Sequence, residues 1–298
     1  MELVGLSEVA EMAGVSRQAV VNWRARFSDF PSPTAELASG PVWIREDIEK
    51  WLKKREGYME GIISRVTGSG KLETHEISLS DFDRLELANA IHAEVTRSDK
   101  FSVTVTTDDN LFNHVDFSKS GGTLRVRLKP WISFRHISAR VAISMPDLRG
   151  IKISGATRAS VSGFGSANAL DIAASGASRL KLDEVKAGDT KIDVSGASHV
   201  TGKLELVDCR MEASGASTVE LNGRGNNIRL DFTGASTARL SEFSAVNVEV
   251  SVGGASKAEV TFSGKLDAEA SGASRISYAG EGTLGKVRVT GASNLNRK

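Results

Sequence analysis

From residue 151 to the end of the chain, apolar and polar residues alternate along short segments separated by turn residues. In one unit, residues 219–221 and 228–232 alternate, and the Asn- and Gly-rich residues 222–227 lie between them. Alternation with a period of two predicts strands that bury one face, and Asn and Gly are typical of turns. We therefore expect two short strands and two corners in each unit.

One short phrase, Ser-Gly-Ala-Ser or a close variant, occurs once in every unit of this region. Its central glycines are Gly155, Gly176, Gly196, Gly215, Gly234, Gly254, Gly272 and Gly291. A period of about 20 residues indicates a solenoid, because so small a unit buries its apolar face only against its neighbours. Neither helical periodicity nor a leucine-rich consensus accompanies the repeat, so the sequence predicts a mainly β protein built on a parallel β-helix.

The repeated phrase predicts a corner that turns in little space. Glycine is expected to supply a positive φ or a close approach of two backbones, and alanine to fill a narrow interior. The serines that end the phrase are expected to form a column with a spacing of about 4.8 Å. This column either satisfies hydrogen bonds at the corner or binds a ligand. No acid, base or nucleophile repeats with it, which favours the structural role.

Residues 1–56 differ from the rest, because their apolar residues have helical spacing. Helices are expected at residues 8–13, 17–26 and 45–55. Ser7 and Ser16 are predicted to cap the first two, with a turn at Gly14 between them. Two helices that meet at a glycine turn are typical of a helix-turn-helix.

The outward side of the second helix carries residue types found in DNA readers. Arg17, Gln18 and Asn22 are able to pair with base edges in the major groove. Residues 16–26 hold three arginines and no acidic residue, so basic charge concentrates on this helix. A solvated helix face is the alternative, and the glycine turn and apolar spacing favour contact with DNA over it.

Several phrases of this region closely resemble the winged helix-turn-helix modules of the AlpA/excisionase and MerR-like type. They are Leu6-Ser7-Glu8-Val9-Ala10, Gly14-Val15-Ser16-Arg17-Gln18, Phe30-Pro31, Gly40-Pro41-Val42-Trp43 and Asp47-Ile48-Glu49-Lys50-Trp51. The resemblance implies that Arg24 and Arg26 reach phosphates and that Ser39 to Trp43 forms the return of the wing. The expected DNA-binding residues are Ser16, Arg17, Gln18, Val21, Asn22, Arg24, Arg26 and Trp43.

The rest of the chain resembles the auto-transporter adhesin head GIN domain, a domain of unknown function. The phrases that carry the resemblance are Phe82-Asp83-Arg84-Leu85-Glu86, Ser102-Val103-Thr104-Val105, Asp109-Asn110-Leu111, Gly122-Thr123-Leu124 and Ser154-Gly155-Ala156. It spans about residues 66–298 and implies a right-handed β-helix. Many members of that family look exported, whereas this chain combines the domain with a predicted DNA-reading head.

Composition and charge narrow the picture in three ways. The chain of 298 residues has a formal net charge of +1, so no global field draws it to nucleic acid or membrane. Its one cysteine, Cys209, alternates with apolar neighbours and is expected to be a buried small residue. The scattered histidines predict no metal site, and nothing indicates a cofactor. The first residues lack a signal-peptide pattern, so we expect a cytoplasmic protein without a membrane partner.

Together these patterns predict a winged helix-turn-helix domain at residues 1–56, a linker at 57–70 and a β-helix at 71–298. The expected function is a DNA-binding transcriptional regulator, without enzymatic activity. Its expected partners are double-stranded DNA, further copies of itself that tighten DNA binding, and an unidentified ligand on the β-helix. A structural polymer with a DNA-binding head and a cell-surface sugar binder are the alternatives.

Overall fold

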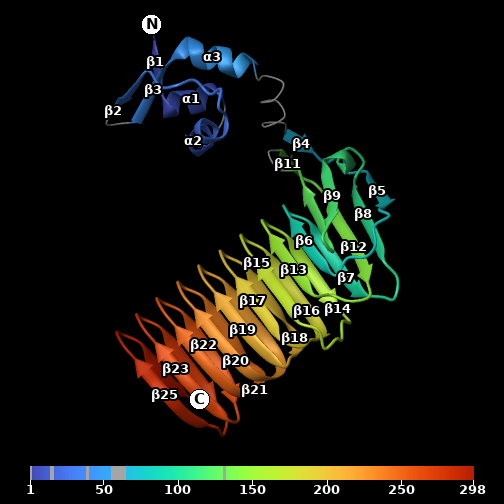
Figure 1. Cartoon of the computed structure of the whole chain (residues 1–298), viewed down its shortest axis with the longest axis vertical. Coiled ribbons are helices and arrows are strands. Elements are labelled where there is room, and N and C mark those ends of the chain that lie inside the picture. Colours follow the sequence, from blue (N-terminus) through green and yellow to red (C-terminus); the bar gives the residue numbers. More distant parts are fainter. Residues whose placement is uncertain (1, 14–16, 38–39, 55–64, 130–131) are drawn as a thin grey trace. The chain divides into compact units, whose positions relative to one another are not determined.

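The computed structural model describes residues 2–13, 17–37, 40–54, 65–129 and 132–298 (Figure 1). Their backbone divides into two compact units. The first comprises residues 1–67 with 130–136, and the second comprises residues 68–129 with 137–298. The chain is mainly β, and the α-helices of the described residues lie in the first unit.

The first unit packs three short helices and one three-stranded sheet around aromatic side chains, and it also contains a separate two-stranded sheet. Its helices are α1 (Leu6–Met12), α2 (Arg17–Arg26) and α3 (Arg45–Lys54). Its strands are β1 (Leu3–Gly5), β2 (Ala35–Leu37), β3 (Gly40–Ile44), β4 (Arg65–Thr67) and β11 (Ser133–Arg135). β3 lies between β1 and β2 and pairs with both in antiparallel fashion, whereas β4 and β11 pair in parallel.

The core of this unit explains the helical spacing in the sequence. Val9, Val20, Trp43 and Ile48 are fully buried, and the ring of Phe30 lies 4.8 Å from that of Trp51. The predictions for α2 and α3 are confirmed to within one residue.

The first helix begins earlier than expected. Gly5 precedes it, and the Gly5 N–H donates a hydrogen bond to the Glu8 carboxylate at 3.1 Å. Ser7 therefore lies inside the first turn and is not its cap. The predicted turn at Gly14 and the predicted cap at Ser16 lie outside the described residues.

The second unit is a β-solenoid of about seven turns. Its strands stack as parallel rungs on two faces, which are called sheet 1 and sheet 2 here (Figure 1). Sheet 1 consists of β6 (Arg84–Ala88), β13 (Gly150–Ser154), β15 (Leu170–Ala174), β17 (Thr190–Val194), β19 (Asp208–Ala213), the second parts of β20 (Thr218–Phe232) and β21 (Thr237–Val252), β23 (Lys265–Ala270) and β25 (Thr283–Val289).

Sheet 2 lies across the solenoid interior from sheet 1. It consists of β7 (His92–Arg97), β14 (Arg158–Ser162), β16 (Arg179–Lys186), β18 (His199–Glu205), the first parts of β20 and β21, β22 (Lys257–Phe262), β24 (Arg275–Ala279) and β26 (Asn294–Arg297). The long strands β20 and β21 pass around a corner and so contribute to both sheets.

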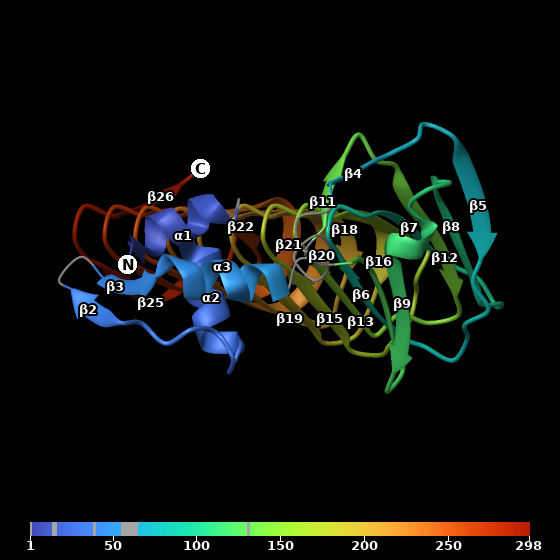
Figure 2. The ribbon, with the colours of Figure 1, turned by 90° about the horizontal axis from the view of Figure 1, so that it is seen from above.

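At the end of the solenoid nearest β6 and β7, the pairing changes from parallel to antiparallel. The elements there are β5 (Leu72–Glu76), β8 (Ser102–Asp108), the 3-10 turn η1 (Phe112–His114), β9 (Val115–Ser120), β10 (Thr123–Leu128) and β12 (Ala139–Met145). β12 is parallel to β7 but antiparallel to β8, and β10 is parallel to β6 but antiparallel to β9. Figure 2 shows β5, β8 and β9 at the opposite end of the stack from β25 and β26.

Inward-facing residues of both sheets fill the solenoid interior. Leu87, Ile153, Val161 and Phe232 are examples that are fully buried. Each such side chain stabilises the fold by about 1.5–3 kcal/mol relative to an exposed one. No single rung supplies enough of these contacts, so the rungs are stable only as a stack.

The repeated phrase forms a corner, as predicted. Its glycines have φ between +69° and +78°. A Cβ on Gly196 would lie 2.5 Å from the Gly176 carbonyl oxygen, so neighbouring corners approach too closely for any side chain. The Ala197 N–H donates to that same oxygen at 2.7 Å, and this bond repeats from rung to rung.

The two residues after the glycine have roles that differ from the prediction. The alanines, such as Ala177 and Ala197, are exposed, so they do not fill the interior. The serines point inward instead and are at most 1% exposed: Ser178, Ser198, Ser217, Ser236, Ser256 and Ser274. Because the left-handed glycine turns the chain sharply, it is the serine that reaches the inside.

The predicted serine column therefore exists, and its role is structural. The Ser178 hydroxyl donates to the Ser198 Oγ at 3.2 Å, and the Ser217 hydroxyl donates to the Ser214 carbonyl at 2.9 Å. These bonds satisfy polar groups that solvent does not reach. Cys209 is also buried, as predicted, and burial raises the pKa of its thiol to about 12.

Candidate ligand-binding groove

Some of the residues predicted to contact DNA are exposed on α2, whereas others interact with residues of the same unit. Arg17, Gln18, Val21 and Asn22 are exposed on one side of α2, where the Gln18 amide donates to the Asn22 Oδ1 at 3.3 Å. Ser16 lies outside the described residues. The outward helix face thus exists, but its amide side chains bond to each other.

The remaining members of that set interact within the unit itself. Arg24 forms an ion pair with Glu36, and its guanidinium lies 6.0 Å from the ring centre of Trp43. Arg26 lies 5.9 Å from the ring centre of Phe27. Trp43 is fully buried, and its indole N–H donates to the Pro31 carbonyl at 2.8 Å. Trp43 is therefore a core residue, so its predicted contact with DNA is wrong.

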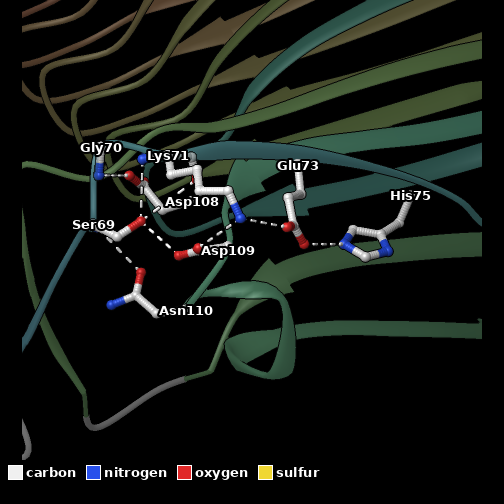
Figure 3. A network of polar contacts seen from close by, with 8 residues as sticks. All are labelled: Ser69, Gly70, Lys71, Glu73, His75, Asp108, Asp109 and Asn110. Carbon is white, nitrogen blue, oxygen red and sulfur yellow. Dashed lines mark hydrogen bonds and ion pairs between the residues drawn. The ribbon is translucent and has the colours of Figure 1, made fainter.

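A dense polar network lies where the second unit begins (Figure 3). The Lys71 ammonium lies 3.1 Å from Glu73 and 3.4 Å from Asp109, and its partner Glu73 raises the pKa of Lys71. The buried Asp108 carboxylate accepts the N–H groups of Gly70 and Ser138, each at 2.8 Å. These contacts hold three chain segments together, around Lys71, Asp108 and Ser138, so we assign the network a structural role.

The described residues contain no group of three or more His, Cys, Asp or Glu arranged to hold a metal ion. Among them there is also no helix long and apolar enough to cross a bilayer.

The outer surface of sheet 1 carries a groove of about 630 Å³ in which cations have carboxylate partners. Ion pairs join Lys191 to Asp193 at 2.9 Å and Arg229 to Glu249 at 2.9 Å. Arg210 pairs with Glu212 at 2.6 Å, and this bond lowers the pKa of Glu212. The charges of this surface are thus neutralised internally, which leaves little attraction for a charged ligand.

The outer surface of sheet 2 carries a groove of about 670 Å³ with a different charge pattern. Five basic residues occupy the same position on five successive rungs. In the order of the rungs they are Arg140, His92, Arg158, Arg179 and His199, and we call them the basic ladder. Strands β12, β7, β14, β16 and β18 supply one residue each.

The arginines of the basic ladder have no acidic partner. No carboxylate among the described residues lies within 4.0 Å of Arg140, Arg158 or Arg179. Glu94 is the one acidic residue among those lining the groove. Like charges at directly paired positions of a sheet destabilise it, so an anion bound along the ladder would offset that repulsion.

Hydroxyl groups accompany the cations. Thr104, Thr106, Ser160 and Thr201 line the same groove, and Thr106 pairs in register with Arg140. Lys181 adds a further cation in the neighbouring row, 3.8 Å from Asp183. No Phe, Tyr or Trp is among the residues that line the groove, and its ring side chains are those of His92 and His199. The site therefore offers charge and hydrogen bonds but no large aromatic stacking surface.

Sequence reasoning missed the basic ladder. Its chain order differs from its spatial order, because β12 lies next to β7, which precedes it in the sequence. One signal was present nonetheless. The residue directly after the repeated phrase is Arg158, Arg179 and His199 in the first three repeats and Thr218 in the fourth.

Residues 81–282 match the family described as "Putative auto-transporter adhesin, head GIN domain". The predicted resemblance to this family is thus confirmed, and the match does not extend to the three helices. No curated protein matches this chain.

Among solved structures, the chain is similar to a "putative lipid binding protein" of Parabacteroides distasonis. The identity is 22%, the match covers 79% of this chain and 100% of that chain, and the TM-score is 0.73. It is also similar to a "putative adhesin" of Parabacteroides merdae, with 20% identity, 79% and 99% coverage and a TM-score of 0.71. A "putative adhesin" of Bacteroides fragilis gives 18% identity, 78% and 100% coverage and a TM-score of 0.60. These likenesses show the shared β-solenoid fold.

The family match corrects the predicted function. A DNA-binding transcriptional regulator is wrong, because most of the chain is the head domain of an adhesin family. The prediction of double-stranded DNA as the partner is accordingly wrong. Self-association was predicted because it would tighten DNA binding, so that argument no longer applies. The error arose because exposed arginines on a short helix resemble a DNA reader, although Arg24 pairs with Glu36 and Trp43 is buried.

The predicted cytoplasmic localisation is also wrong. It relied on a few residues at the start of the chain, whereas the matched family is described as auto-transporter adhesins, a class of surface or secreted proteins. The family match covers more than half of the sequence and shares its solenoid fold with the solved structures above. This chain therefore belongs to the auto-transporter adhesin head GIN domain family.

Proposed function

We propose that this chain is a surface-exposed or secreted binding protein whose basic ladder takes an anionic ligand. The observation that carries the proposal is the row of arginines on sheet 2 without carboxylate partners, in contrast to the groove on sheet 1, whose lining cations are paired. Adhesin-type recognition is in keeping with the family. One structural neighbour is described as a lipid-binding protein, and an anionic headgroup and an acidic surface polymer share the required chemistry.

The charge of the groove supports this proposal quantitatively. Four cations, Arg140, Arg158, Arg179 and Lys181, line it together with one carboxylate, Glu94. A hydrogen bond between charged partners contributes about 1.5–3 kcal/mol, so two or three such bonds give usable affinity. Screening limits attraction to groups within about 8 Å at physiological ionic strength, which restricts the effect to ligands in contact with the groove.

We also propose that the groove binds its ligand without transforming it. Glycoside hydrolysis, for example, generally uses two carboxyl groups that flank the scissile bond. The groove supplies Glu94 without a second carboxylate among the residues that line it. Turnover of a bound acidic polymer would be visible as shortened products after prolonged incubation, and we expect none.

Two finer features of the fold belong to the proposal. We propose right-handed coiling of the solenoid, because about 98% of parallel crossover connections have that hand. For residues 2–54 we propose a winged helix-turn-helix arrangement as a fold alone, supported by the antiparallel order β1-β3-β2 beside three helices. An experimental structure of the full chain tests both features.

A double variant tests the proposed function. Arg158→Gln with Arg179→Gln removes two adjacent ladder charges, and Arg229→Gln with Arg239→Gln removes two arginines that have carboxylate partners. Binding of the full-length protein is measured to phosphatidylglycerol vesicles and to polygalacturonate, with phosphatidylcholine vesicles and dextran as neutral controls.

We expect the wild type and the paired-arginine control to bind at least one anionic probe and neither neutral one. The ladder variant should bind roughly ten-fold or more weakly, which corresponds to the loss of one or two charged hydrogen bonds. Equal binding by the ladder variant and the wild type would show that the groove is not the site. Circular dichroism confirms that each variant is folded.

A further inference from the structure

The basic ladder has a direction as well as a charge. Its five residues follow one another along the stacking axis, each in register with the next. At about 4.8 Å per rung, the four intervals span about 19 Å. A single phosphate or carboxylate contacts one or two rungs. The whole row is matched only by a ligand that carries several negative charges along its length.

Building on the proposed function, we infer that the ligand is an acidic polysaccharide chain that lies along the solenoid axis over the basic ladder. Its carboxylates would face the arginines, and its hydroxyls would bond to the Thr and Ser side chains beside them.

Hydroxyl-bearing residues continue the row beyond the cations on both sides. Before Arg140 come Thr106 and Thr74, whose hydroxyls bond to each other at 2.8 Å. After His199 come Thr218 and Thr237 in the same register. Threonine hydroxyls donate and accept hydrogen bonds, as sugar hydroxyls do. The same line of positions therefore suits a polyhydroxylated chain that is longer than the ladder itself.

The lining of the groove disfavours other linear polyanions. Single-stranded nucleic acids are generally bound by grooves in which aromatic side chains stack on bases. The residues lining this groove include no Phe, Tyr or Trp. Linear polyphosphate would accept hydrogen bonds from Thr104, Ser160 and Thr201 but would donate none to them, whereas sugar hydroxyls do both.

The same lining disfavours insertion of a lipid. Exposed large apolar residues occur elsewhere in the described chain, as at Val207, Val246 and Leu284, and none of them lines this groove. Ala93, Val141 and Leu180 line its floor but are buried side chains that point into the solenoid. An acyl chain would therefore find no exposed large apolar side chain there, although an anionic headgroup would still be attracted.

The dependence of affinity on the length of the ligand chain tests the inference. Full-length protein is titrated by calorimetry with galacturonate, with oligogalacturonates of increasing defined length, and with neutral dextran oligomers of the same lengths. Linear polyphosphate of comparable span and phosphatidylglycerol vesicles serve as competing anions. The ladder double variant Arg158→Gln with Arg179→Gln and its paired-arginine control are titrated in parallel.

We expect affinity for oligogalacturonates to rise at least ten-fold from the monosaccharide to a chain that covers the ladder, and then to level off. The ladder variant should lose this gain, and the paired-arginine control should keep it. Affinity independent of length would overturn the inference. So would tighter binding of polyphosphate or of the vesicles than of the longest oligogalacturonate.

These outcomes separate the inference from the proposed function. If the ladder variant binds every anion as tightly as the wild type, the proposed function fails together with the inference. If it loses binding to vesicles or polyphosphate while chain length has no effect, the groove remains an anion site and only the polysaccharide assignment is wrong.

Discussion

The guanidinium of Arg158 lies against the imidazole of His92, with Nη1 2.9 Å from Nε2, although 66 residues separate them in the sequence. They meet because β14 and β7 pair in parallel on adjacent rungs. On the next rung in one direction, His92 pairs with Arg140, and in the other direction Arg158 pairs with Arg179. The fold thus assembles basic groups that gain nothing from one another, which is typical of a binding surface retained at some expense of stability.

Removing one ladder charge should therefore stabilise the free protein. Arg179→Thr takes away a cation that is in register with Arg158 and His199, and threonine suits a strand. We expect the free energy of unfolding in low salt to rise by about 0.2–1 kcal/mol, while affinity for an anionic ligand falls. Urea unfolding of ligand-free protein measures the first effect.

The control for this prediction is Arg229→Thr, which breaks the pair with Glu249. It should leave stability unchanged or lower it slightly. The gain from Arg179→Thr should also shrink in high salt, because salt screens exposed charges. A loss of stability for Arg179→Thr in low salt would contradict the idea that the ladder is strained.

A glycine of the repeated corner should not tolerate alanine. Gly196 has φ of +75°, and a Cβ there would meet the Gly176 carbonyl oxygen at 2.5 Å. A left-handed conformation costs an L-residue about 1–2 kcal/mol before any clash is counted. We expect Gly196→Ala to lower the free energy of unfolding by at least about 2 kcal/mol, measured as a shift of the urea midpoint.

Gly165→Ala is the matched substitution. Gly165 has no neighbouring atom within 4 Å of the position where a Cβ would be, and it is not among the glycines with positive φ. Its replacement should change stability by less than about 0.5 kcal/mol. Similar losses for both variants would mean that the corner geometry is not what requires glycine.

The sequence predicted the solenoid well because its cause is local and repeated. Each repeat carries its own glycine, and the alternation on either side fixes which residues point inward, as at Ile192 and Val194. The positions of alanine and serine were interchanged, because the phrase does not reveal how far the left-handed glycine rotates the chain. Ser178 is buried and Ala177 is exposed.

The candidate groove was beyond sequence reasoning for a different reason. His92 and Arg140 become neighbours through the pairing of β7 with β12, and neither strand carries the repeated phrase. The arginines of α2, in contrast, attracted attention because they cluster in the sequence. Residues that are close in the sequence lie close together on a helix. On a solenoid, in contrast, the residues of one surface site come from neighbouring rungs and are far apart in the sequence.

The buried serine column should be sensitive to the loss of an acceptor. The Ser178 hydroxyl is fully buried and donates to Ser198. Ser198→Ala leaves that donor without this partner, which costs about 1–3 kcal/mol. Thermal unfolding measures the loss.

Thr157 occupies the same position in the first repeat and provides the contrast. It is fully buried, and its hydroxyl has no hydrogen-bond partner among the described residues. Thr157→Val should therefore be neutral or raise stability by up to about 1 kcal/mol, because it removes an unsatisfied polar group at constant shape. If Thr157→Val destabilises as much as Ser198→Ala, hydrogen bonding is not what the column provides.

The buried Cys209 thiol should make stability depend on pH in alkaline solution. Burial raises its pKa from 9.0 to about 12, so the folded state keeps the proton while the unfolded state releases it. The stabilisation is complete below pH 9 and is lost as the pH rises toward 12, since unfolding then releases a proton. Three pKa units correspond to an upper limit of about 4 kcal/mol.

Cys209→Ala lacks this group, so the difference in unfolding free energy between wild type and variant should shrink steadily between pH 9 and pH 11. Parallel pH profiles for the two proteins would show that the thiol is ionised as readily in the fold as outside it, and rapid reaction of the folded protein with a thiol reagent at pH 8 would lead to the same conclusion.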